Sequence, residues 1–124
     1  MSSGLRVLIV DDNAGVAEII RDTVEDLGNL AMACFSGVEA LQLVTRFRPD
    51  VLLLDLDMPG TSGVDVARTL RGDRQFDRLK IIAQTAHGTA EDRRATARAG
   101  FDLHLAKPLS VQMLDDVLSL LKFR

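Results

Sequence analysis

The chain has 124 residues, a formal net charge of −3 and 47% hydrophobic residues. This length suits one domain, and the hydrophobic content supports a packed core and excludes a disordered chain. The negative charge and the lack of Trp and Tyr argue against direct nucleic-acid binding, and no apolar run approaches the roughly 20 residues that span a membrane. Residues 1–4 show no secretion signal, so we expect a cytoplasmic domain over residues 5–124 after a short leader.

Hydrophobic periodicity alternates between strand and helix along the chain. The continuous apolar run Leu5–Val10 predicts a first strand, and Asn13 can cap a helix that Gly28 ends. The apolar face of this helix is expected to consist of Val16, Ile19, Ile20, Val24 and Leu27. Leu30–Cys34 predicts a weaker second strand, in which Cys34, the only cysteine, is expected to be a small core residue.

The middle of the chain continues the same alternation. The capping-box spacing from Ser36 to Glu39 opens a second helix, and Val51–Leu54 is the most hydrophobic strand. The second helix is expected to bury Ala40, Leu41, Val44 and Phe47. A loop from Asp55 to Ser62 leads to a short helix whose apolar positions are Val64, Ala67 and Leu70.

Two further units complete the chain. Lys80–Gln84 predicts the fourth strand, and Thr89 can cap a helix that ends before Gly100. The apolar positions of this helix are mostly Ala95, Ala97 and Ala99, so we expect it to pack lightly. Phe101–Ala106 predicts the fifth strand, and Ser110 can cap a last helix. That helix is expected to turn Leu114, Val117, Leu118 and Leu121 inward.

Five strand–helix units with continuous apolar strands predict a parallel sheet covered by helices on both faces. Right-handed crossovers then favour a doubly wound α/β fold. In such a sheet the carboxyl ends of the strands line one crevice, where ligands bind. Polar residues follow four of the predicted strands at this edge: Asp11 and Asp12, Asp55, Thr85, and Lys107 before Pro108.

Three carboxylates brought together in this way need a cation or must become protonated. Two unit charges about 4 Å apart repel by roughly 4 kcal/mol at an effective dielectric constant near 20. Oxygen ligands in an open cleft favour Mg²⁺, and Lys107 adds a second positive charge. Asp55 is then the best candidate for a nucleophile toward phosphorus, and Thr85 can donate its hydroxyl to a phosphoryl oxygen. Taken alone, the three aspartates are equally compatible with ordinary turn residues, whereas Thr85 is more often a structural residue and Lys107 more often a solvated strand end.

The motifs that carry these residues are Leu8–Asn13, Asp55–Gly60 followed by Gly63, Thr85-Ala86 and Lys107-Pro108. Together they resemble the response-regulator receiver family, the phospho-accepting modules of two-component signalling, from Val7 to Leu121. The resemblance implies a flavodoxin-like sheet with strand order 2-1-3-4-5.

The resemblance also assigns roles in the acidic part of the site. It implies that Asp55 is phosphorylated and that Asp12 ligates Mg²⁺ directly. It implies further that Asp11 assists the metal through water, and that Asp57 supplies a backbone carbonyl.

Other assignments concern the switch. The resemblance implies that Lys107 contacts the phosphoryl group, that Thr85 is the switch hydroxyl, and that Pro108 follows a cis peptide bond. One departure is His104, which stands where the family commonly has Tyr or Phe as its second switch residue. A histidine there is compatible with a pH-sensitive switch or with an ordinary strand residue. His87 is expected at the pocket mouth or on a solvated loop.

These expectations favour a phosphorelay domain over a turnover enzyme. A sensor histidine kinase or a histidine phosphotransfer protein would phosphorylate Asp55, and an output protein of unknown identity would recognise the altered surface. Two alternatives remain: a phosphatase of the haloacid-dehalogenase type, suggested by Asp55-x-Asp57, and a receiver-like module that binds a partner without phosphorylation. The sequence is compatible with a stand-alone protein and with a piece of a larger kinase.

Overall fold

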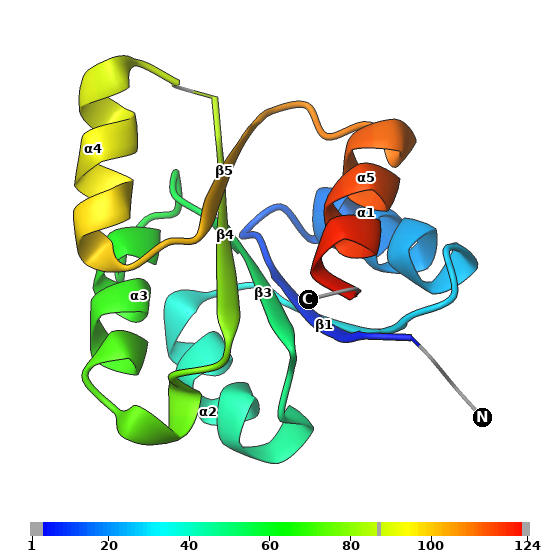
Figure 1. The fold of residues 1–124 in the computed structure, drawn as a ribbon, viewed down its shortest axis with the longest axis horizontal. Helices are drawn as coiled ribbons and strands as arrows, with labels where there is room; N and C mark the ends of the chain where they lie inside the picture. Colours follow the sequence, from blue (N-terminus) through cyan, green and yellow to red (C-terminus); the bar gives the residue numbers. More distant parts are fainter. Residues whose placement is uncertain (1–3, 87, 123–124) are drawn as a thin grey trace.

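The computed structural model describes residues 4–86 and 88–122, which form one parallel sheet between two layers of helices (Figure 1). The strand order is β2-β1-β3-β4-β5, as predicted. The strands are β1 (Arg6–Val10), β2 (Leu30–Cys34), β3 (Val51–Asp55), β4 (Lys80–Thr85) and β5 (Leu103–Ala106). The helices are α1 (Ala14–Asp26), α2 (Gly37–Phe47), α3 (Gly63–Arg71), α4 (Ala90–Ala99) and α5 (Val111–Lys122), with a 3₁₀ turn, η1 (Arg74–Phe76), after α3. Helices α1 and α5 cover one face, and α2, α3 and α4 cover the other.

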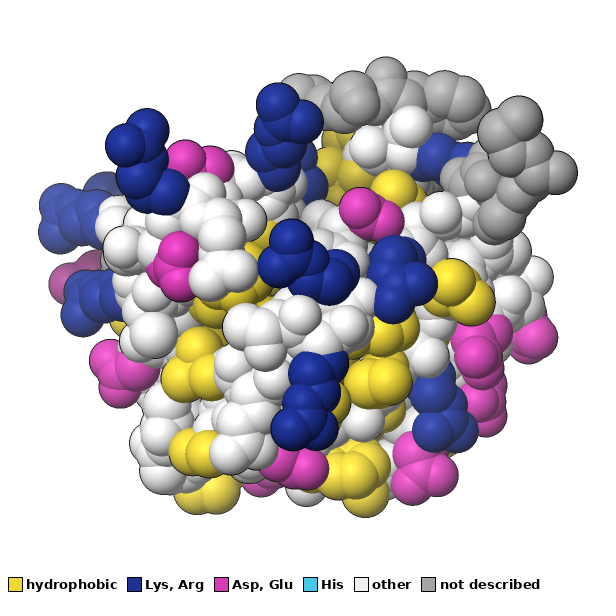
Figure 2. All heavy atoms as spheres, turned by 90° about the horizontal axis from the view of Figure 1, so that it is seen from below, with side chains coloured by type: hydrophobic (Ala, Val, Ile, Leu, Met, Phe, Trp, Pro, Cys, Tyr) yellow, Lys and Arg dark blue, Asp and Glu magenta, His cyan; other side chains and the backbone are white. Residues whose placement is uncertain are grey.

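The surface at which β3 and β4 begin mixes basic, acidic and apolar side chains (Figure 2). Two hollows open near these strand starts: Arg48 and Arg78 line one, and Arg78, Lys80 and Lys122 line the other. The acidic residues predicted for the functional site lie at the opposite, carboxyl ends of the strands. Among the residues described, no helix is long and apolar enough to cross a membrane.

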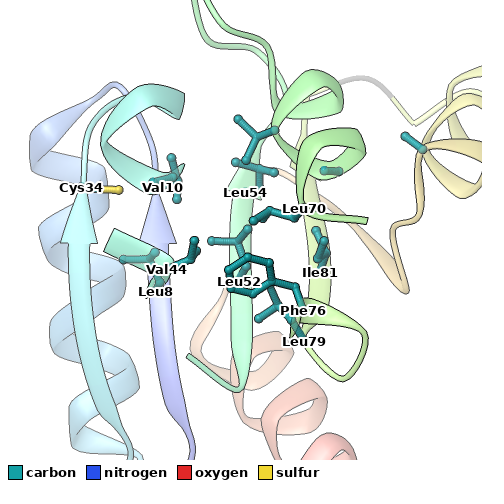
Figure 3. Close-up of a cluster of buried hydrophobic side chains, with 14 of the residues drawn as sticks. Leu8, Val10, Cys34, Val44, Leu52, Leu54, Leu70, Phe76, Leu79 and Ile81 are labelled. Atoms are coloured by element: carbon teal, nitrogen blue, oxygen red, sulfur yellow. The ribbon is translucent and has the colours of Figure 1, made fainter. Parts of the chain in front are cut away.

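Each strand contributes to both cores because successive side chains point to opposite faces of the sheet. In β3, Leu52 and Leu54 face α2 and α3, whereas Val51 and Leu53 face α1 and α5. Figure 3 shows the first of these cores, which also contains Cys34. Cys34 is 1% exposed, and its burial raises the pKa of its thiol to about 12. The cysteine is therefore a core residue, as expected.

Side-chain caps fix where most helices begin. The side-chain oxygen of Asn13 accepts a hydrogen bond from the Val16 N–H at 3.1 Å at the start of α1. The hydroxyl of Thr89 accepts from the Asp92 N–H at 3.1 Å at the start of α4. The predicted caps Ser36 and Ser110 act in the same way, and so does Ser62 before α3. These bonds satisfy amide groups that have no partner within a helix.

The predicted buried face of α1 is partly wrong, and in α4 the buried positions only partly coincide with the apolar ones. In α1, Ala17, Ile20 and Val24 are buried, whereas Val16 is 40% and Ile19 67% exposed. Val16 and Ile19 line the cavity at the strand ends instead of packing into the core.

In α4, Thr96 and Ala99 are buried, whereas Ala95 and Ala97 are exposed. Alanine side chains are too small to set the rotation of a helix, and the Thr96 hydroxyl is satisfied by the Arg93 carbonyl at 2.9 Å. Strand β5 also begins two residues later than predicted, at Leu103. β5 begins later because Gly100 ends α4 in a left-handed conformation, and because the Asp102 carboxylate accepts from the Ile81 N–H at 2.8 Å.

Candidate functional site

The carboxyl ends of β1 and β3 bring three carboxylates together. Asp11 and Asp55 are 2% and 1% exposed, respectively, whereas Asp12 is exposed. One oxygen from each of Asp11, Asp12 and Asp55 lies within 4.8 Å of the other two. These residues line a cavity of about 490 Å³ together with Asp57 and Lys107. The acidic cluster that the sequence predicts is therefore present in the fold.

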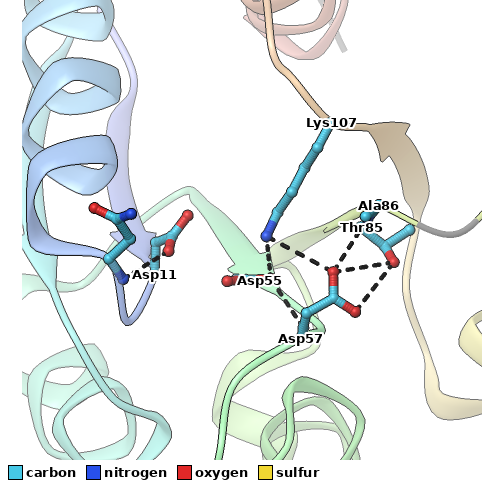
Figure 4. Close-up of polar contacts among 7 residues, drawn as sticks. Asp11, Asp55, Asp57, Thr85, Ala86 and Lys107 are labelled. Atoms are coloured by element: carbon cyan, nitrogen blue, oxygen red, sulfur yellow. Dashed lines mark hydrogen bonds and ion pairs between the residues drawn. The ribbon is translucent and has the colours of Figure 1, made fainter.

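Lys107, which directly follows β5, reaches the Asp55 carboxylate of this cluster. Its Nζ donates to Asp55 Oδ1 at 2.7 Å and lies 3.7 Å from Asp57 Oδ2 (Figure 4). Burial acts to lower the pKa of Lys107, but the hydrogen bond and negative charge of Asp55 outweigh it, so this pKa is raised. The lysine is therefore a cation held against Asp55. The peptide bond between Lys107 and Pro108 is cis.

Asp57 uses its side chain as well as its backbone. Its N–H donates to Asp55 Oδ1 at 2.9 Å, which helps to hold the Asp55 carboxylate in place. Its own carboxylate accepts from the Ala86 N–H at 3.1 Å and from Thr85 Oγ1 at 3.4 Å. The sequence suggested only a backbone role for Asp57, and it gave no role to the Ala86 N–H. Asp57 thus links the ends of β3 and β4 beside the Asp55 carboxylate (Figure 4).

The excess negative charge of the cleft favours the binding of a divalent cation. The pKa of Asp11 is raised mainly by burial. Repulsion from Asp55 raises this pKa further, whereas the hydrogen bond from the Asn13 N–H lowers it. One lysine does not balance the three carboxylates of the cluster, which offers oxygen ligands only. Hard cations such as Mg²⁺ prefer such ligands, particularly where the cleft leaves room for water.

His104 lies outside this cleft. It is half-buried on β5, and its Nδ1 lies 3.4 Å from Thr96 Oγ1 on α4. Its Nε2 is buried without a hydrogen-bond partner among the described residues. His104 therefore connects β5 to α4, the helix predicted to pack lightly. His87 lies outside the described residues.

Sequence reasoning missed two parts of the cavity. One is an apolar wall formed by Val16, Ile19, Ile20, Pro108 and Leu109. The other is Gln84, a buried residue of β4 that lines the same cavity. A sequence signal for Gln84 was present, because its amide side chain directly follows three apolar residues, 81–83, and precedes Thr85. No comparable signal existed for Val16 and Ile19, whose spacing is that of an ordinary buried helix face.

Comparisons with known proteins agree with this geometry. The family model for the response regulator receiver domain matches residues 7–119. The polar-differentiation response regulator DivK of Brucella ovis is 33% identical over 105 residues, which cover 85% of each chain. The receiver domain of a Francisella response regulator is similar in structure, with a TM-score of 0.88 and 29% identity over 98% of each chain. The receiver domain of a sensor histidine kinase from Pseudomonas aeruginosa, which holds a magnesium ion in its active-site cleft, has a TM-score of 0.87 and 29% identity over 98% of this chain and 99% of that one.

Proposed function

The chain belongs to the response regulator receiver family, the phospho-accepting signalling domains of two-component systems, and we propose that Asp55 is the residue that becomes phosphorylated. The observation that carries this assignment is the setting of the Asp55 carboxylate. It is 1% exposed, fixed through Oδ1 by Lys107 and the Asp57 N–H, and grouped with two further carboxylates. The domain is a phospho-acceptor rather than a turnover enzyme. We assign residues 5–124 to it, around the matched residues 7–119.

The reaction that this setting supports is a single phosphoryl transfer. A carboxylate oxygen of Asp55 attacks phosphorus, the P–N bond of a donor phosphohistidine breaks, and an acyl phosphate forms on Asp55. The electron pair of the broken bond returns to the donor imidazole, which takes up a proton. Lys107 neutralises charge on the transferred group, while the Asp57 N–H holds the acceptor carboxylate in place.

The proposal includes a magnesium site formed by Asp11, Asp12 and Asp55, with the backbone carbonyl of Asp57 as a further ligand. When bound, Mg²⁺ would supply positive charge to the phosphoryl oxygens and balance the clustered carboxylates. The magnesium ion in the related Pseudomonas receiver domain supports this part of the proposal.

The same proposal gives Thr85 and His104 a switching role. Thr85 lies next to the cleft and shares the Asp57 carboxylate with the Ala86 N–H. A phosphoryl group on Asp55 would offer the Thr85 hydroxyl a new acceptor and shift the equilibrium between two arrangements of this loop. His104, in contact with Thr96 of α4, would transmit the shift to the surface formed by α4 and β5.

The partners follow from this chemistry. We propose a sensor histidine kinase or a histidine phosphotransfer protein as the donor, an output protein as the recipient of the signal, and a cytoplasmic location. The apolar wall beside the cleft, with the exposed residues Val16 and Ile19, supplies area for a donor protein. Neither nucleic acid nor a membrane is a direct partner in this proposal.

Phosphorylation of the isolated chain tests the assignment. We expect incubation with Mg²⁺ and acetyl phosphate to add one phosphoryl group to the parent and none to Asp55→Asn, as measured by intact mass. Asp77→Asn, which changes an exposed carboxylate remote from the cleft, is the control and should label like the parent. Labelling of Asp55→Asn would contradict the assignment. If neither chain labels, even with a histidine-phosphorylated donor, the domain is a binding module without phosphorylation.

A further inference from the structure

A buried amide stands next to the proposed acceptor. Gln84 is 1% exposed and pairs in register with Asp55 across the parallel strands β3 and β4. Paired residues of neighbouring strands place their side chains on the same face of the sheet. The other buried side chains of β4 before Thr85 are apolar: Ile81, Ile82 and Ala83. Gln84 is therefore a polar exception in the strand, beside the reacting residue.

One polar atom of the Gln84 side chain is buried but unsatisfied among the residues that the structure describes. This atom is the amide nitrogen Nε2, a hydrogen-bond donor. The backbone carbonyl of Gln84, in contrast, accepts from the Leu56 N–H at 3.0 Å. A buried donor without an acceptor destabilises the folded state, and buried polar groups are nearly always satisfied. Gln84 also lines the cavity that contains Asp55 and Lys107, so an acceptor inside that cavity would satisfy it.

The strand order indicates which group in the cavity can accept a hydrogen bond from Gln84. Asp11 and Asp12 follow β1, which lies on one side of β3, whereas Gln84 belongs to β4 on the other side. Figure 4 shows the same arrangement, with Asp11 on one side of Asp55 and the end of β4, marked by Thr85 and Ala86, on the other. We therefore expect a phosphoryl group attached to Asp55 to lie nearer to Gln84 than a cation held by Asp11, Asp12 and Asp55 does, because two of the three cation ligands lie on the far side of Asp55.

We propose that Gln84 is a further phosphoryl-binding residue of this site, whose side-chain N–H donates to an oxygen of the phosphoryl group on Asp55, directly or through one bound water. The inference rests on the proposed function, because it requires Asp55 to carry the group. It predicts that the donor is unsatisfied in the free protein and satisfied in the phosphorylated one. Gln84 then stabilises the phosphorylated state relative to the free state.

Thermal unfolding of the parent and of Gln84→Met tests this. Met has a similar volume and no donor, so the free variant should melt about 3–6 °C above the free parent. Mg²⁺ alone should leave this gap in melting temperature between variant and parent unchanged. Mg²⁺ with beryllofluoride, which mimics the phosphoryl group on a carboxylate, should stabilise the parent more than the variant and reduce the gap to less than half. Gln84→Leu provides a second apolar variant should the first fold poorly.

The controls separate this inference from the proposed function. When Asp55→Asn is added to both the parent and the Gln84→Met chain, beryllofluoride should not change the gap between them, because the attachment point is lost. An unchanged gap in a parent that labels and responds to beryllofluoride would overturn the role of Gln84 alone. A gap that closes with Mg²⁺ alone would also overturn it, since the acceptor would then belong to the metal shell. A parent that neither labels nor responds would overturn the proposed function and this inference together.

Discussion

At the scale of single residues, the clustered carboxylates of the acidic cleft destabilise the folded chain. Asp11 is 2% exposed and shares the cleft with Asp55, which repels it. Burial and repulsion both disfavour its charged form, which is why the pKa of Asp11 is raised. Binding sites commonly contain such unfavourable buried charges and repulsions, because ligand binding relieves them.

The raised pKa of Asp11 gives a pH dependence with a definite sign. The folded chain holds the Asp11 proton more tightly than the unfolded chain. The contribution of Asp11 to stability is therefore fully present below the unfolded carboxyl pKa and is lost as pH rises through the raised folded value. Without Mg²⁺, Asp11→Asn should thus be more stable than the parent at pH 7, by about 1 kcal/mol. The difference should shrink as the pH falls toward about 4, the usual carboxyl pKa.

Urea unfolding from pH 4 to pH 7 in the presence of a chelator measures this difference. The amide oxygen introduced by Asp11→Asn can still accept from the Asn13 N–H, so the loop after β1 should be kept. Adding Mg²⁺ should stabilise the parent and have a much smaller effect on the variant. A parent–variant difference that stays constant across this pH range would show that Asp11 does not titrate as its burial requires.

At the scale of elements, α3 begins against the strand that carries Asp55. A Cβ added to Gly63, the first residue of α3, would lie 2.7 Å from the Asp55 carbonyl oxygen and 2.9 Å from a Leu56 methyl group. Real Cβ atoms do not approach backbone oxygen this closely, so the helix start or the strand end must move. The close approach of α3 therefore helps to set the position of Asp55, the proposed acceptor.

We expect Gly63→Ala to destabilise the chain by about 1–3 kcal/mol through overpacking and to slow phosphorylation of Asp55. Gly72→Ala, at the other end of α3, is the matched control. Its added Cβ would meet the Thr69 carbonyl oxygen at 3.5 Å, an ordinary contact, and should change stability by no more than about 0.5 kcal/mol. Urea unfolding and the acetyl phosphate assay measure both effects. If the two variants have the same stability and the same phosphorylation rate, the start of α3 can shift away from β3 at little cost.

The elements also show what the sequence could and could not predict. Continuous apolar runs placed β1, β3 and β4, because strands that are buried on both faces of a sheet need them. The edge strands β2 and β5 are only partly buried, and the start of β5 was predicted two residues too early. Caps such as Asn13 and Thr89 placed the helix starts, since their side chains satisfy amides locally. The buried face of a helix depends on tertiary contacts instead. For this reason Ile19 was predicted to be buried and is exposed, and Thr96 was overlooked although it is buried.

The candidate site was predictable to the same degree. Asp11, Asp55 and Lys107 could be predicted to meet because parallel strands end at one edge of the sheet. The contact of the Asp57 carboxylate with the Ala86 N–H was not predictable, since it depends on how two loops fold over that edge. Gln84 was missed for a different reason: an amide at the end of an apolar strand is visible in the sequence, but its place beside Asp55 follows from the strand register.

At the scale of the whole molecule, the two cores are joined through the strands that they share. Ile81 and Ile82 are consecutive in β4, are 0% and 1% exposed, and belong to different cores. Disturbing one core therefore changes the strand that supports the other. Domains of this size commonly unfold as a single unit, and this shared sheet is a physical reason to expect the same here.

Cys34 is a reporter for this cooperativity. It belongs to the core that contains Ile81, and in the folded chain it is 1% exposed with its thiol pKa raised to about 12, so it should react with thiol reagents only after unfolding. Ile81→Val and Ile82→Val each remove one buried methylene and should each destabilise the chain by about 0.5–1.5 kcal/mol. If both cores unfold together, each variant should raise the rate of Cys34 labelling by about 2- to 12-fold at low reagent concentration, where opening stays at equilibrium. An increase for Ile81→Val without one for Ile82→Val would show instead that the layer of α2, α3 and α4 opens independently of the layer of α1 and α5.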